Sequence, residues 1–109
     1  MTTKELQQRA LEIRKQFAIY ERQQGSPEWD TREIMEGFVV DVGDLMKLVM
    51  AQQGLRKVEG LDEKIAHELA DCLWCVLVLA SKLGVDLEKA FTDTMNSLET
   101  SVATKLRKS

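Results

Sequence analysis

Two pairs of acidic residues interrupt otherwise apolar helical stripes, and these residue types at this spacing could do chemistry. Asp41 and Asp44 lie three residues apart, and Glu68 and Asp71 repeat the spacing in the next segment. Residues three apart share one face of a helix. Asp41 lies in the middle of an apolar stripe, and Asp71 stands alone inside the apolar run 69–80. A lone buried carboxylate is costly, so it normally takes up a proton or binds a cation.

The four acids could converge on a divalent metal. The connector between their two helices is short, which favours antiparallel packing and brings the two pairs together. A ligand set made only of oxygen atoms suits Mg²⁺ or Mn²⁺ rather than Zn²⁺. The competing interpretation is a solvated helix face with structural ion pairs. It fits Asp44 and Glu68 taken alone, whereas the apolar surroundings of Asp41 and Asp71 favour the metal.

The elements that must position these acids are four helices. Apolar residues spaced by four and three predict the first helix, and Gly25, Ser26 and Pro27 end it. Thr31 and Asp86 are the expected N-caps of the second and fourth helices, and Gly54 and Gly84 the expected glycines after the second and third. We expect helices over residues 3–24, 31–53, 62–83 and 87–105, and a frayed polar tail over 106–109.

The third helix is apolar nearly all round between Leu69 and Ala80. This pattern predicts a buried central helix that is covered on several sides, in part by another subunit. The expected fold class is therefore all-α, a four-helix bundle completed by dimerisation. A chain of 109 residues fits a single helical domain over residues 1–109.

Composition narrows the function. The net charge of −3 argues against a nucleic-acid-binding protein but is compatible with a nucleotide substrate, because a bound metal supplies local positive charge. The N-terminus has no apolar signal region, and the longest apolar run is too short to span a bilayer. We therefore expect a soluble, cytoplasmic protein with no membrane partner.

Three segments together resemble the MazG-like, all-α nucleotide pyrophosphohydrolase superfamily. They are DVGDL (41–45), HELADCLW (67–74) and GVDLEKAF (84–91), and the resemblance covers about residues 29–100. It implies a four-helix core, a homodimer or dimer of dimers, and house-cleaning hydrolysis of a nucleoside triphosphate to monophosphate and pyrophosphate. Carried over by position, the metal ligands and catalytic residues would be Asp41, Asp44, Glu68 and Asp71.

The chain departs from the family pattern in two places. The first acidic pair is Asp-x-x-Asp where the family has Glu-x-x-Glu, and residues 95–101 (MNSLETS) lack the Lys and Arg that many relatives carry there. Asn96 remains as a hydrogen-bonding residue for the substrate, and Trp29 as a surface on which a base could stack. Two alternatives stay open: a pyrophosphatase for another nucleotide, such as a phosphoribosyl-nucleotide, and an inactive helical module for oligomerisation or regulation.

Two further signals favour structural roles. Cys72 and Cys75 form a C-x-x-C, but they lie in the middle of an apolar helix, which indicates core packing rather than redox chemistry. His67, the only histidine, is expected to be partly exposed and to point away from the acids. One helix with three candidate ligands and no second cluster does not predict a structural zinc site.

Overall fold

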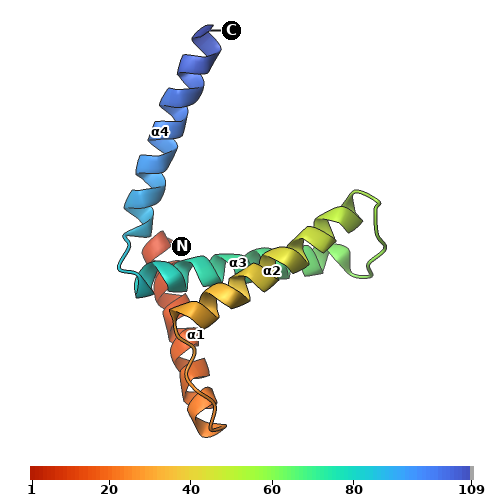
Figure 1. The fold of residues 1–109 in the computed structure, drawn as a ribbon, viewed down its shortest axis with the longest axis vertical. Coiled ribbons are helices and arrows are strands. Elements are labelled where there is room, and N and C mark those ends of the chain that lie inside the picture. Colours follow the sequence, from red (N-terminus) through yellow and green to blue (C-terminus); the bar gives the residue numbers. More distant parts are fainter. Residues whose placement is uncertain (109) are drawn as a thin grey trace.

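The computed structural model describes residues 1–108 and consists of four helices (Figure 1). The helices are α1 (Thr3–Gln23), α2 (Thr31–Gln52), α3 (Leu61–Lys82) and α4 (Leu87–Lys108). No strand occurs in the described part of the chain, so the all-α prediction is confirmed. None of the four helices is long and apolar enough to cross a membrane.

The α2–α3 hairpin is the centre of the fold. The two helices lie antiparallel along each other, and α1 crosses them at the end away from their connector (Figure 1). Ile34 of α2 and Val78 of α3 are fully buried at this crossing. The indole Nε1 of Trp74 donates to the carbonyl of Ala10 at 3.2 Å, which ties α3 to α1. Helix α3 therefore packs against both α2 and α1.

Local sequence explains where α2 begins, and it corrects the expected cap. The N-cap is Asp30, not Thr31. The Asp30 carboxylate accepts from the Thr31 N–H at 2.7 Å, and the Glu33 carboxylate accepts from the Asp30 N–H at 3.0 Å. This reciprocal capping box satisfies N–H groups that the first turn leaves unpaired, and an acid there also suits the helix dipole. Thr31 is the first helical residue instead.

Glycine ends α2 and α3 as the sequence predicts. Gly54 has a φ of +83°, and the N–H of Leu55 reaches back to the Met50 carbonyl at 2.9 Å. This is the Schellman arrangement, which needs a left-handed residue after the helix and therefore favours glycine. A third glycine, Gly60, precedes α3 with a φ of +63°, so that helix begins at Leu61, one residue before the predicted start.

Helix α4 projects from the rest of the chain as an arm (Figure 1). It continues to Lys108, so the prediction of a frayed tail is wrong for residues 106–108; Ser109 lies outside the described residues. None of residues 87–108 is buried. The radius of gyration is 17.7 Å, whereas a compact domain of this length has about 13 Å. The single chain thus has the four helices of the predicted bundle without closing it.

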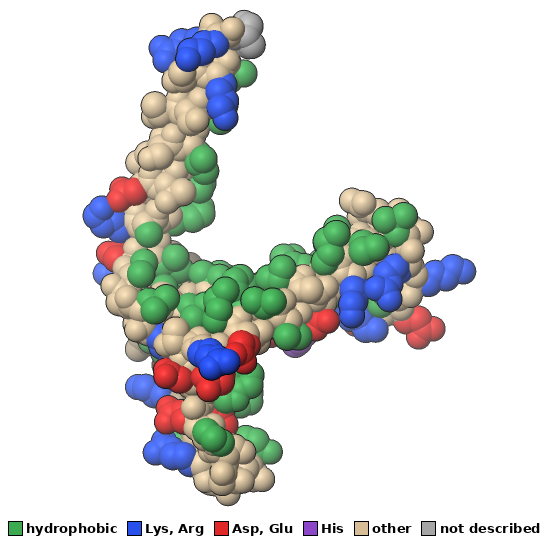
Figure 2. All heavy atoms as spheres, viewed as in Figure 1, with side chains coloured by type: hydrophobic (Ala, Val, Ile, Leu, Met, Phe, Trp, Pro, Cys, Tyr) green, Lys and Arg blue, Asp and Glu red, His purple; other side chains and the backbone are tan. Residues whose placement is uncertain are grey.

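Apolar side chains follow the inner side of this arm and continue over the hairpin (Figure 2). On α4 they include Phe91, Met95, Leu98 and Val102, which recur every three or four residues and lie 40–62% exposed. On α3, Leu69 and Leu73 are 53% and 47% exposed, so part of the cover expected for this helix is missing in the single chain. Dimerisation stays a prediction.

Candidate metal centre

The hairpin brings the predicted acids together. Asp41, Asp44 and Glu68 each contribute one carboxylate oxygen to a group whose atoms lie within 4.8 Å of one another. A second group, with its atoms within the same distance, consists of Glu68, Asp71 and His67. Glu68 belongs to both groups and therefore lies at the centre. The i, i+3 spacing places each pair on one helix face, and the antiparallel packing of α2 against α3 makes the two faces meet.

Glu68 is the electrostatic focus of this cluster. Its Oε2 is buried and has no hydrogen-bond partner among the described residues. Burial raises the pKa of Glu68, and the charges of Asp41, Asp71 and Asp44 raise it further, with His67 acting in the opposite direction. A buried carboxylate oxygen without a partner, facing three other acids, is the arrangement that a hard divalent cation would stabilise. The donor set therefore fits Mg²⁺ or Mn²⁺.

Asp41 lies against the apolar side of α3. The Cys75 thiol donates to Asp41 Oδ2 at 3.7 Å. Burial, followed by the charge of Asp41, raises the pKa of Cys75 to about 11, and the pKa of Cys72 is raised for the same two reasons. Both cysteines are free, and Cys75 is buried. Because a raised pKa suppresses the thiolate, the pair behaves as core filler, which agrees with the interpretation of the C-x-x-C.

His67 is exposed, as expected, but its predicted direction is wrong. Its Nε2 lies 3.0 Å from Asp71 Oδ2, one helical turn away. The i, i+4 spacing of His67 and Asp71 is the sequence signal for this contact. His67 thus holds one oxygen of Asp71 at the open side of the cluster.

A hollow of about 730 Å³, here called the aromatic hollow, lies on the α1 side of the acids. Trp29 lines it together with Asp41 and Asp71, so the structure brings this predicted substrate-binding residue to the edge of the acidic cluster. The Trp29 ring also lies over Gly37, where an added Cβ would approach the ring to 3.2 Å. Further side chains of the aromatic hollow are Phe17, Trp74 and Cys75.

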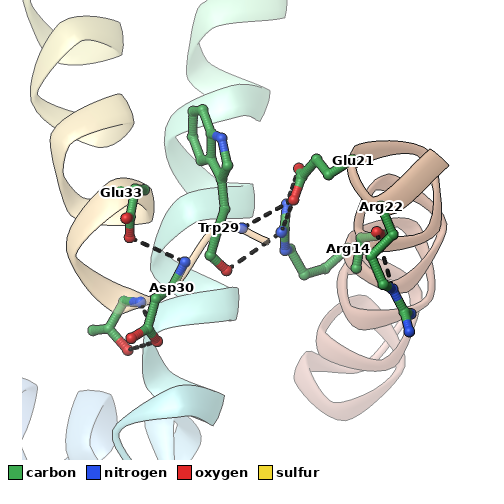
Figure 3. Close-up of polar contacts among 8 residues, drawn as sticks. Arg14, Glu21, Arg22, Trp29, Asp30 and Glu33 are labelled. Atoms are coloured by element: carbon green, nitrogen blue, oxygen red, sulfur yellow. Dashed lines mark hydrogen bonds and ion pairs between the residues drawn. The ribbon is translucent and has the colours of Figure 1, made fainter. Parts of the chain in front are cut away.

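An ion pair that the sequence analysis missed fixes the backbone of Trp29 (Figure 3). Arg14 Nη2 lies 2.7 Å from Glu21 Oε1, and both side chains are largely buried. Glu21 Oε1 also accepts from the Trp29 N–H at 2.9 Å, while Arg14 Nη2 donates to the Trp29 carbonyl at 3.3 Å. The hydrogen bond from Arg14 lowers the pKa of Glu21. The seven-residue spacing, two turns along one helix face, was the available signal.

A second hollow, here called the basic hollow, lies on the connector side of the acids and has a volume of about 520 Å³. Asp44 and Glu68 line it, and Lys47, Arg56 and Lys64 contribute cationic side chains. These three cations lie on the hairpin, not on the fourth helix, where the family pattern would place them. Lys47 follows Asp44 by three residues and Lys64 precedes Glu68 by four, so helical spacing was the signal.

Asn96 is the one predicted site residue that the single chain keeps apart from the others. It lies on the projecting α4, and the backbone carbonyl of Asn96 accepts a hydrogen bond from the Thr100 hydroxyl at 3.1 Å. It lines neither the aromatic hollow nor the basic hollow. A role in binding would require α4 to meet the acidic cluster of another copy.

Comparison with known protein families assigns most of the hairpin and much of α4 to one domain type. The family model of the MazG nucleotide pyrophosphohydrolase domain matches residues 41–101, which is more than half of the chain. The matched stretch contains all four acids and continues into α4. No curated protein and no solved structure matches the chain.

Proposed function

The chain belongs to the MazG nucleotide pyrophosphohydrolase family, and from this premise we propose that it cleaves a nucleoside triphosphate to monophosphate and pyrophosphate with a divalent metal. The observation that carries the proposal is Glu68 Oε2, a buried oxygen at the centre of the acids that has no hydrogen-bond partner within residues 1–108. Structural acids normally find a donor when they are buried. This one instead faces like charges, which is useful only when a cation joins them.

The proposed ligands are Asp41, Asp44, Glu68 and Asp71, and the proposed ion is Mg²⁺ or Mn²⁺. When bound, such an ion offsets the charge of the phosphates and lowers the pKa of a coordinated water. The protein's own contribution is to hold the carboxylates in place. His67 restrains Asp71 on the open side, and the Cys75 thiol restrains Asp41 on the apolar side. Such neighbours orient the ligands of a metal site.

Trp29 is the proposed platform for the base. The ion pair of Arg14 with Glu21 fixes its backbone, and its ring borders a hollow that reaches Asp41 and Asp71. An aromatic face accepts any base by stacking. This geometry supports a nucleotide that enters with its base beside Trp29 and its phosphates toward the acids.

We also propose that the working form is a homodimer or a dimer of dimers. A helix of 22 residues with no buried residue gains little from its own propensity, because most helical stability in proteins comes from packing of an apolar face. The stripe of Phe91, Met95, Leu98 and Val102 provides such a face. A second copy that covers it would also be the means by which Asn96 could reach a substrate.

Product analysis tests the proposed reaction. The purified protein is incubated with ribo- and deoxynucleoside triphosphates and a phosphoribosyl-nucleotide, in Mg²⁺ or Mn²⁺, beside the Asp71→Asn variant. We expect monophosphate and pyrophosphate from the wild type and neither from the variant. Asp62→Asn, on the same helix but outside the cluster, is the matched control and should keep its activity.

The negative outcomes distinguish the alternatives. Release of inorganic phosphate in place of pyrophosphate would refute cleavage between the first two phosphates. Hydrolysis of the phosphoribosyl-nucleotide, without hydrolysis of any nucleoside triphosphate, would identify phosphoribosyl-nucleotides as the substrate class. No turnover, together with a melting temperature that does not respond to metal, would favour a helical module without catalysis.

A further inference from the structure

The basic hollow places three cations one helical turn beyond the acids, on the side of the connector. On α2, Lys47 follows Asp44 by three residues; on α3, which runs in the opposite direction, Lys64 precedes Glu68 by four. Both steps therefore lead toward the same end of the hairpin. Arg56, in the connector between the two helices, lines the same hollow.

These cations are not used by the fold itself. No ion pair or side-chain hydrogen bond involves Lys47, Arg56 or Lys64 within residues 1–108. Three acids also line the hollow, but Asp44 and Glu68 belong to the metal cluster, so Glu63 is the one lining acid outside that cluster. Figure 2 shows Lys and Arg side chains gathered at this end of the hairpin, in a chain whose net charge is −3.

The position of Lys64 is locally unfavourable. It is the fourth residue of α3, close to the N-terminus of the helix, where the helix dipole favours acids over cations. The two residues before it, Asp62 and Glu63, follow that preference. A cation that opposes the dipole, has no side-chain partner in the described part of the chain and lines a hollow is well placed to bind an anion from outside.

The hairpin therefore has three zones in sequence along its length. The aromatic hollow lies at the α1 end, the four acids lie in the middle, and the basic hollow lies at the connector end. From Asp41 to Lys47 the helical rise amounts to about 9 Å. A nucleotide lying along the hairpin would place its base, its reacting phosphate and its terminal phosphates on these zones in that order.

We propose that the basic hollow is a phosphate-binding subsite that holds the pyrophosphate end of the substrate through Lys47, Arg56 and Lys64. Charge-assisted hydrogen bonds from Lys and Arg are the usual means of binding phosphate oxygens. The place of this subsite in the reaction rests on the proposed function, but its affinity for pyrophosphate does not require turnover. In this chain, the hairpin supplies the cations that were sought on the fourth helix.

Calorimetric titration of the Mg²⁺-loaded protein with inorganic pyrophosphate tests the subsite. Arg56→Gln should weaken binding about threefold and the double variant Lys47→Gln/Lys64→Gln about tenfold, as expected for lost charge-assisted bonds at an open site. Lys57→Gln is the matched control, because it removes the same charge from the next residue, which does not line the hollow. Its affinity should equal that of the wild type.

Failure of the subsite and failure of the proposed reaction give different results. If the wild type does not bind pyrophosphate, or if all variants bind it equally, the subsite is overturned even when nucleotides are hydrolysed. If pyrophosphate binding weakens only in the variants of Lys47, Arg56 and Lys64, and no nucleotide is hydrolysed, the subsite is supported and the proposed reaction is refuted. Circular dichroism and an unchanged melting response to Mg²⁺ show that the variants remain folded.

Discussion

Replacing Glu68 with Gln should raise the stability of the protein when metal is absent and lower it, relative to the wild type, when metal is bound. Gln keeps the size of the side chain and removes one negative charge from the centre of the cluster. Without metal, the change relieves repulsion from Asp41, Asp44 and Asp71, so Glu68→Gln should be more stable than the wild type. With saturating Mg²⁺, the wild type gains the stability of the bound ion and the variant does not.

The size of each effect follows from the geometry. Two like charges 4.8 Å apart, the limit within which these oxygens lie, repel by roughly 1 kcal/mol in water and about 3 kcal/mol at an effective dielectric constant of 20. Because the cluster is partly exposed and screened by salt, we expect a net gain of about 1–2 kcal/mol, or about 4–8 °C in melting temperature. Metal at a hundredfold excess over its Kd adds about 2.7 kcal/mol to the wild type, or about 10 °C.

The assay is thermal unfolding of wild type, Glu68→Gln and the connector control Glu59→Gln, each in EDTA and in a Mg²⁺ series. The wild type should lie below Glu68→Gln in EDTA and above it in saturating Mg²⁺, and Glu59→Gln should follow the wild type throughout. If Glu68→Gln is less stable than the wild type in EDTA, the acids do not repel one another as the geometry implies. If Mg²⁺ leaves the wild type unchanged, the metal centre itself is refuted.

Three further perturbations test the parts that surround the centre. Trp29→Ala should raise KM for the nucleotide while leaving the Mg²⁺ melting shift intact, and an unchanged KM across the substrate panel would remove Trp29 from the base site. Gly54→Ala should lower the free energy of unfolding in urea by about 1 kcal/mol, because it forces a φ of +83° on a residue with a Cβ. Gly43→Ala, inside α2 where an added Cβ meets no other atom, should raise that free energy by about 0.5–1 kcal/mol. Equal effects of the two substitutions would contradict the assigned turn. Since Arg14 lowers the pKa of Glu21 below the ordinary 4.5, the ion pair contributes stability above pH 4.5 that is lost as pH falls through the folded-state value. The melting temperature should therefore fall on acidification by more in the wild type than in Glu21→Gln, and parallel curves would count against the ion pair.

The sequence was sufficient for the acidic cluster because each step of that inference was local. The i, i+3 spacing within each pair is a property of a single helix, and the short connector dictated antiparallel packing. The glycines after α2 and α3 were equally readable, since the left-handed turn requires that residue type. The N-cap of α2 was predicted one residue too late, because Asp30 and Thr31 are both good N-cap residues. Only the hydrogen bond between the Asp30 N–H and the Glu33 carboxylate distinguishes them.

The remaining features depend on contacts that a sequence pattern does not specify. Arg14 is buried because Glu21 and the Trp29 carbonyl face it; the seven-residue spacing can pair Arg14 with Glu21, but no sequence pattern brings the Trp29 carbonyl to them. Lys47 and Lys64 are polar residues on a polar helix face, so nothing in the apolar periodicity singles them out. The apolar stripe on α4 indicates which face of the helix should be covered, but it does not specify the surface that covers it.

The four acids all lie between residues 41 and 71, within one pair of neighbouring helices, and this has a consequence for how the protein folds. Loop-closure entropy grows with the length of chain between contacting residues, and domains rich in local contacts fold fastest. Closing the hairpin brings the acids together with the three cations at its connector end in one event. Trp29 reaches its place only when Arg14 and Glu21 of α1 engage the preceding loop. The half of the site that handles phosphate can therefore form early, and the half that would select the base forms when α1 docks.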